Sequence, residues 1–131
     1  MENQLNLSKL ATSTYIALET YRKNGQGVIT PVWVTAEDDK LFVWTRGSTG
    51  KVKRIRSNAK VKLCESDGRG KPHSDWAEAR ARLLTQPEEL EKQQKRMASK
   101  YGFQYRVLSF MGRLSRNKDS NIVIELSFLD N

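Results

Sequence analysis

The residues best placed to do chemistry in this chain lie between Thr45 and Arg54, where hydroxyl and basic side chains follow one another closely. Thr45 and Ser48 supply hydroxyl groups, and Lys51 and Arg54 supply positive charge three residues apart. At the start of a helix such a set is typical of a phosphate site, because backbone N–H groups there lack intrahelical acceptors and the helix dipole adds about half a positive charge. Lys51 and Arg54 would share one helix face. On spacing alone, a solvated basic helix without a ligand is an equally good interpretation.

The segment from Arg46 to Lys62 is basic throughout. It contains seven Lys or Arg residues and no acidic residue, whereas the rest of the chain has 16 basic and 15 acidic residues. The formal net charge of +8 is therefore a local property, and it predicts an anionic partner for this segment. The chain contains neither GxxxxGK[ST] nor GxGxxG, which excludes the common nucleotide-binding loops.

A second candidate region is formed by Pro31, Val32 and Trp33. Proline has no N–H to donate to a strand ladder, so Pro31 predicts a sheet edge or a bulge. Irregular backbone at this point could lie against a flat ring system. The better-supported interpretation is that Trp33 and Trp44 are ordinary core residues, which is the more common situation for large aromatic side chains. The sequence pattern leaves both interpretations open.

No side chains form a recognisable catalytic or metal-binding set. His73, the single histidine, lies in a Gly/Pro loop, and no serine or carboxylate is placed to form a triad with it. Cys64 is the single cysteine, so neither an intrachain disulfide nor a Cys/His metal site can be built. We therefore expect no metal and no catalytic residue supplied by the protein itself.

Periodicity and turn residues predict the elements that must position these groups. Strands are expected at residues 14–20, 28–35, 41–45, 60–64, 76–83 and 121–128. Residues 6–11 could end a first helix, and helical spacing predicts helices at 51–57, with Val52 and Ile55 on one side, and at 105–114. A helix at 90–101 is expected between the start signal Pro87 and the stop residue Gly102. The segment 76–83 is ambiguous, because its alanines favour a helix while its small/charged alternation favours a strand; we assign it as a strand. The first three strands are joined by short turns, which predicts a meander.

Six strands joined mostly by short turns predict a mainly β (α+β) fold, a small antiparallel barrel with a few flanking helices. The 131 residues fit a single domain, 1–131. Hydrophobic residues make up 37% and charged residues 29%, so the charged residues must either coat a small core or share a core across a subunit interface, which a dimer would provide. The chain shows no secretion signal and no apolar run of about 20 residues, which predicts a cytoplasmic protein without a membrane partner.

An ordered series of segments along the chain is similar to one protein family. The segments are residues 15–25, 30–34, 43–45, 50–55, 67–70 and 100–102, together with Ser48 and Asn58. This series resembles the pyridoxamine 5'-phosphate oxidase-like split-barrel proteins, and more narrowly their short flavin/deazaflavin oxidoreductase branch. The resemblance covers most of the chain, and the series is far more specific than any one of its motifs.

The resemblance implies a split β-barrel homodimer that binds FMN or the deazaflavin coenzyme F-420 in a cleft between the subunits. It implies that Thr45, Ser48 and Lys51 contact the phosphate and that Arg54 assists the anionic tail. The backbone of Pro31, Val32 and Trp33 would lie beside the ring. The implied function is an oxidoreductase that transfers a hydride between the cofactor and a small organic substrate.

The chain departs from pyridoxamine phosphate oxidases proper in one respect that bears on the substrate. It has no Arg-x-His pair near its C-terminus to hold a phosphorylated substrate, so vitamin B6 oxidation is not expected. A flavin or F-420 carrier or sensor without turnover is the alternative. A basic nucleic-acid-binding module is more remote, because the positive charge is compact and no series of aromatic residues runs beside it.

Overall fold

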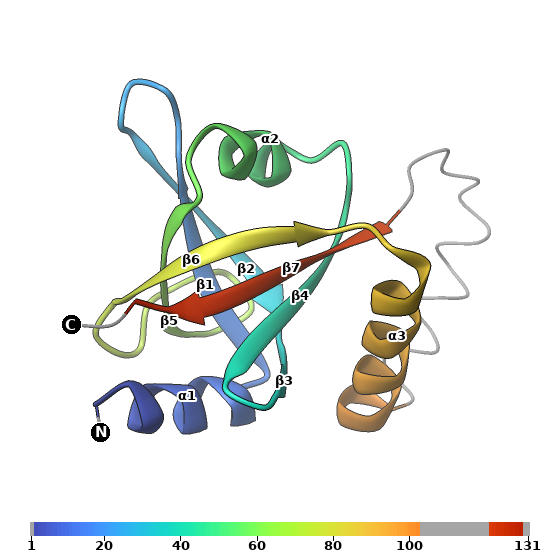
Figure 1. The fold of residues 1–131 in the computed structure, drawn as a ribbon. Helices are drawn as coiled ribbons and strands as arrows, with labels where there is room; N and C mark the ends of the chain where they lie inside the picture. The colour runs from blue at the N-terminus through green and yellow to red at the C-terminus, as the bar shows by residue number, and fades with distance from the viewer. Residues whose placement is uncertain (1, 103–120, 130–131) are drawn as a thin grey trace.

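The computed structural model describes residues 2–102 and 121–129 (Figure 1). The elements in chain order are α1 (Glu2–Thr12), β1 (Tyr15–Tyr21), β2 (Gly27–Trp33), β3 (Thr35–Glu37), β4 (Lys40–Arg46), α2 (Gly50–Ser57), β5 (Lys60–Ser66), β6 (Ala77–Leu84), α3 (Pro87–Tyr101) and β7 (Asn121–Phe128). The helix expected at residues 105–114 lies outside the described residues.

The strands form one antiparallel sheet with the order β2-β1-β5-β6-β7-β4-β3. The sheet curls, with α1 and α2 at its opposite ends and α3 along the side that carries β3 and β4 (Figure 1). The predicted mainly β, antiparallel fold with flanking helices is therefore confirmed. Within the described residues, no helix combines the length and the apolar composition required to cross a bilayer.

Alternate positions of β1, β4 and β7 form the central apolar cluster, and the residues between them are also largely buried. In β1, Ile16 and Leu18 are fully buried and belong to the central apolar cluster, as do Val43 of β4 and Ile124 of β7. Their neighbours along each strand point to the opposite face, because successive side chains alternate. The core therefore lies inside the curl of the sheet.

The ambiguous segment 76–83 is a strand, β6, so this prediction is confirmed. Ala79 and Ala81 face the core, whereas Arg80 and Arg82 are exposed, which is the pattern of a strand with one buried face. Small side chains at the inward positions leave room for the opposite wall of the curled sheet. The helix propensity of alanine is overruled by this tertiary packing.

The predicted strand at 28–35 is wrong in one respect, because it is divided at Val34 into β2 and β3. The sheet therefore has seven strands rather than six. The predicted meander is also wrong beyond its first hairpin: β2 pairs with β1, whereas β4 pairs with β3 and β7. The physical reason is that β2 and β3 form the two opposite edges of the curled sheet, and the chain passes from one edge to the other at Val34.

Helix α3 holds this crossing point. The backbone N–H of Val34 donates to the Tyr101 hydroxyl at 2.9 Å, and the Val34 carbonyl accepts from Lys100 Nζ at 2.6 Å. Burying these backbone groups without partners would be costly, so α3 supplies what the strand ladders do not. The helix begins at Pro87, and its C-cap is Gly102 with φ 56°, in line with the predicted start and stop signals.

Candidate functional site

The turn between β4 and α2 brings the predicted phosphate-contacting residues into one short segment. Thr45 is the penultimate residue of β4 and is buried, and Lys51 is the second residue of α2. Thr45 Oγ1 lies 3.4 Å from Thr49 Oγ1, which in turn donates to the Arg46 carbonyl at 3.0 Å. These contacts hold the turn in a compact form, with Ser48 at its exposed middle.

The N-cap residue at the start of α2, Thr49, gives the helix no side-chain cap. The first turn contains no acidic residue. The first N–H groups of any helix lack intrahelical acceptors, and the helix dipole makes this end positive. An anion at this position would therefore supply both missing interactions. Val52 and Ile55, which were predicted to share one side of this helix, are both buried and pack α2 against the end of the barrel.

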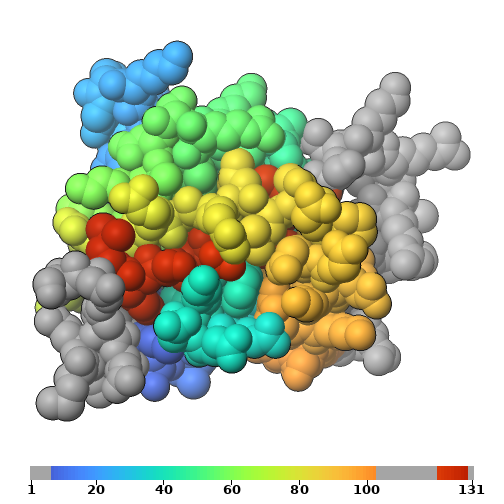
Figure 2. All heavy atoms as spheres, viewed as in Figure 1, coloured from blue at the N-terminus to red at the C-terminus, as the bar shows by residue number. Residues whose placement is uncertain are grey.

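Arg54 folds back toward the start of its own helix. Its Nε donates to the hydroxyl of Thr20 at 2.6 Å, and a Cβ atom added at Gly50 would lie only 2.7 Å from its Nη1. The guanidinium therefore lies over Gly50, between α2 and the end of β1. Gly50 allows this approach because it has no side chain. In Figure 2 the β1–β2 hairpin projects beside α2 on the same rim of the molecule.

Positive charges are crowded at this rim. Burial lowers the pKa of Lys51, and the nearby charge of Arg54 lowers it further. Burial also lowers the pKa of Arg54, with a second contribution from Arg22. Among the described residues, no carboxylate forms an ion pair with Lys51 or Arg54. A bound anion would relieve this repulsion and favour the protonated lysine.

Pro31, Val32 and Trp33 lie on β2, an edge strand, so the predicted edge position of Pro31 is confirmed. Val32 faces the core and is buried. The Trp33 ring stacks on Tyr101 with a centroid distance of 4.1 Å and an interplanar angle of 5°. The indole therefore packs against protein, and the backbone of this segment is what remains to face another molecule.

The structure does not place these three residues in the immediate surroundings of Arg54. Thr20, which binds Arg54, pairs with Val28, and Pro31 lies three residues further along β2. At about 3.3 Å per residue the separation along the strand is about 10 Å. The two predicted halves of the site are thus set apart along one strand. Only an elongated ligand could contact both.

Two residues of this rim were not predicted from the sequence. Thr20 is fully buried in β1 at a position that continues the core-facing series Ile16 and Leu18. A polar residue at an apolar position of an alternating strand is a signal that could have identified it. Arg22 follows β1 at the start of the hairpin, and no feature of its spacing links it to Arg54.

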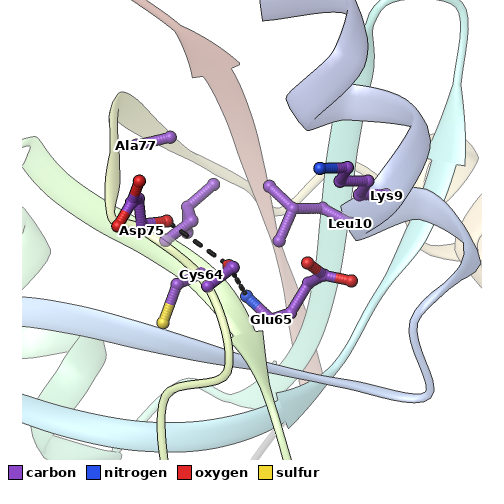
Figure 3. Close-up of a pocket in the computed structure, with 8 residues that line it drawn as sticks. Lys9, Leu10, Cys64, Glu65, Asp75 and Ala77 are labelled. Atoms are coloured by element: carbon purple, nitrogen blue, oxygen red, sulfur yellow. Dashed lines mark hydrogen bonds between the residues drawn. The ribbon is translucent and has the colours of Figure 1, made fainter.

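A separate cavity of about 110 Å³ lies at the other end of the barrel, between α1 and β5 (Figure 3). Lys9 and Leu10 enter it from α1, while Glu65 and Asp75 bring carboxylates from the opposite side. The Cys64 thiol points away from α1 (Figure 3), and burial raises its pKa to about 11. This cavity is small and carries both signs of charge, so it is a poor match for a phosphate.

The curled antiparallel sheet and the basic strand-to-helix junction at its rim define a split-barrel protein. The model of the family described as pyridoxamine 5'-phosphate oxidase matches residues 6–129. The chain therefore belongs to the pyridoxamine 5'-phosphate oxidase family. A search of curated proteins finds no match.

Solved structures from several bacteria share this fold. A candidate pyridoxamine 5'-phosphate oxidase from Listeria innocua is 13% identical, with a TM-score of 0.67 over 99% of this chain and 95% of that one. The haem storage protein HutZ from Vibrio cholerae is 14% identical, with a TM-score of 0.68 over 100% and 93% of the two chains. An FAD-binding protein from Mesorhizobium loti is 17% identical, with a TM-score of 0.59 over 96% and 89%. At these identities the likeness is one of fold alone.

Proposed function

We propose that this protein is a homodimeric oxidoreductase that holds FMN or coenzyme F-420 and transfers a hydride between that cofactor and a small organic substrate. The observation that carries the proposal is the crowded N-terminus of α2. There Lys51 and Arg54 meet without an acidic ion-pair partner among the described residues. A phosphate ester satisfies a helix N-terminus and two cations at once.

The residues present fit the phosphate end of such a cofactor. Thr45 and Ser48 offer hydroxyl groups at the turn, Lys51 offers an ammonium group, and Arg54 is oriented by its hydrogen bond to Thr20. Thr45 and Arg54 are already held by hydrogen bonds, so these two side chains would lose little freedom on binding. Arg22, on the neighbouring hairpin, adds a third positive charge for an anionic tail.

The ring end would lie against the backbone of Pro31, Val32 and Trp33. The separation of about 10 Å along β2 suits an elongated molecule with an anion at one end and a flat ring at the other. When bound, a flavin or deazaflavin supplies hydride transfer, and the protein binds and orients it. Family membership and the FAD-binding neighbour support a flavin, whereas the residue series that resembles the short deazaflavin branch favours F-420.

Cofactor binding is tested by titrating the protein with FMN and with F-420 and following the quenching of cofactor fluorescence. We expect at least one to bind. Lys51→Ala should weaken it about 10-fold to 100-fold, because one charge-assisted hydrogen bond contributes roughly 1.5–3 kcal/mol. Lys51→Glu should nearly abolish binding, because it adds repulsion to that loss.

The matched control is Lys53→Ala, which removes the same charge from an exposed position two residues along the same helix. Its affinity should change far less than that of Lys51→Ala. Equal losses in the two variants would indicate a general charge effect rather than a phosphate site. Binding of DNA or RNA with a steep salt dependence, and of neither cofactor, would contradict the proposal.

Turnover distinguishes the enzyme from the carrier or sensor. The reduced holoprotein is mixed with a panel of small organic acceptors, and reoxidation of the cofactor is followed by absorbance. An acceptor that accelerates reoxidation of the reduced holoprotein, but not of the same reduced cofactor free in solution, supports the oxidoreductase. Tight cofactor binding without reoxidation by any acceptor would favour the carrier.

A further inference from the structure

The last two residues of α3, Lys100 and Tyr101, bind the backbone both between α1 and β1 and between β2 and β3. Lys100 Nζ donates to the carbonyls of Ala11, Ser13 and Val34 at 2.9, 2.7 and 2.6 Å. An ammonium group has three hydrogens, so all three are used. Two of these carbonyls lie where α1 leads into β1, and the third lies where β2 leads into β3.

The Tyr101 hydroxyl repeats this arrangement. It accepts from the Val34 N–H at 2.9 Å, and its single hydrogen faces the carbonyls of Thr14 at 2.8 Å and Val34 at 3.0 Å. The hydroxyl is therefore satisfied as both donor and acceptor. Together Lys100 and Tyr101 bind both the N–H and the carbonyl of Val34, the residue at which the chain passes from one edge of the sheet to the other.

The Tyr101 ring adds a contact to the residue just before the crossing. Trp33 lies parallel to it at 4.1 Å, and the Tyr15 ring meets Trp33 edge-on at 6.5 Å and 63°. Strand β2 has only β1 as a hydrogen-bonded neighbour in the described sheet, so its free side lacks a second strand. Besides the ladder with β1, the direction of its last residues depends on the contacts made by α3 and on Gly70, which lies beside Pro31.

We propose that Lys100 and Tyr101 are positioning residues for the ring end of the cofactor site. They act through Val34 and Trp33 on the backbone from Pro31 to Trp33, and they do not belong to the phosphate end. The inference rests on the proposed function. It goes further by dividing cofactor recognition between two structural units: α2 holds the anion, and the end of α3 sets the wall against which the ring lies.

If α2 binds the phosphate and the end of α3 positions the ring wall, variants in the two helices should change ligand affinity in different ways. Loss of a hydrogen bond at Val34 should let the end of β2 shift, which weakens contact with the ring and leaves α2 unaltered. Loss of Lys51 should weaken only the contacts to the phosphate group, which the cofactor and inorganic phosphate have in common. A merely structural role of Tyr101 would not separate the two ends, because a loss of folded protein lowers the apparent binding of every ligand together.

The test measures two constants for each variant at matched ionic strength. The first is the dissociation constant of FMN or F-420, whichever the wild type binds, and the second is the inhibition constant of inorganic phosphate in competition with it. Tyr101→Phe keeps the ring stack and removes the hydroxyl. We expect it to weaken the cofactor about 3-fold to 10-fold, the range of one or two neutral hydrogen bonds, with the phosphate constant unchanged.

Lys51→Ala should weaken both constants, and Lys95→Met, at a side chain that is 80% exposed on α3, should change neither. Lys100→Met is the second positioning variant, and Tyr101→Phe keeps the test open if that variant does not fold. An unchanged cofactor constant in Tyr101→Phe, or an equal loss of phosphate, would overturn the inference while leaving the proposed function standing. A wild type that binds neither cofactor would overturn both.

Discussion

At the scale of single residues, Lys100 combines two opposing influences on its charge. Three carbonyl oxygens surround Nζ and favour the ammonium form, whereas removal from water disfavours it. Burial prevails and lowers the pKa of Lys100 to about 8. The residue therefore changes charge in a range that is accessible to experiment, and the contacts at Val34 change with it, because a neutral amine has only two hydrogens to donate.

The lowered pKa gives Lys100 a defined effect on stability. An unfolded lysine has a pKa of about 10.4, so between about pH 8 and pH 10 the unfolded chain binds more protons than the folded one. Stability from this group should therefore rise with pH across that range. We expect the free energy of unfolding of wild type, relative to Lys100→Met, to increase from pH 7 to pH 10 in urea denaturation.

The control for this pH dependence is Lys95→Met, whose site on α3 is largely exposed. Its difference from wild type should stay flat with pH. Other groups that titrate in the same range are common to all three proteins and cancel in the comparison. A wild type that loses stability relative to Lys100→Met as the pH rises would show that the carbonyl oxygens outweigh burial.

Residue-level chemistry was predictable where it is local. Thr45, Ser48, Lys51 and Arg54 fall within ten residues, so a strand-to-helix junction gathers them whatever the rest of the chain does. The contact between Arg54 and Thr20 joins residues that are 34 positions apart. No local pattern specifies such a pair, although a threonine at a core-facing position of β1 hints at a partner.

At the scale of elements, the loop after β5 supports the edge strand that carries Pro31. Gly70 is buried with φ 86°, and a Cβ atom there would lie 3.3 Å from Pro31 Cδ. Gly25, in the β1–β2 turn, has φ 91° and nothing within 4 Å of its hypothetical Cβ. The two glycines share the same kind of backbone and differ in their surroundings, so they form a matched pair.

Alanine at these two glycines should separate backbone strain from packing. Gly25→Ala should lower the free energy of unfolding by about 1–2 kcal/mol, the cost of a side chain in the left-handed region. Gly70→Ala should lose this amount and about 1 kcal/mol or more besides, because its Cβ must displace Pro31. Urea denaturation measures both. Equal losses would mean that the loop yields without disturbing β2.

The elements themselves were largely predictable, and their pairing was not. Alternation identified β6 despite its alanines, and Pro87 and Gly102 marked the two ends of α3. Pro31 indicated an edge or a bulge nearby, but nothing local marked the break at Val34, whose backbone partners lie in α3, more than 60 residues away. Period and turn signals describe a strand, but they do not say which edge of a closed sheet the strand will occupy.

At the scale of the whole molecule, the net charge of +8 opposes the pairing of two copies. In the proposed homodimer the cofactor lies between the subunits and brings negative charge to that interface. Binding and dimerisation must then be linked, since a ligand that binds the dimer in preference to the monomer shifts the equilibrium toward the dimer.

Sedimentation velocity at a series of protein concentrations tests this linkage. We expect a dimer of twice the 15.0 kDa chain mass, and we expect the bound cofactor to lower its dissociation constant. Lys51→Glu should remove the effect of the cofactor, and it should not weaken the cofactor-free dimer, because it lowers the positive charge of each copy. A monomer that binds cofactor fully without any shift in self-association would argue against a cleft between subunits.

The hydrogen bond from Val34 to Tyr101 also has a meaning for the way the molecule opens. The Val34 amide is protected by a helix side chain rather than by a neighbouring strand, so it can exchange with solvent only when the end of α3 lifts away. The same release frees the carbonyls held by Lys100 at the start of β1. We therefore expect the start of β1, the crossing at Val34 and the last turn of α3 to open together as one cooperative unit.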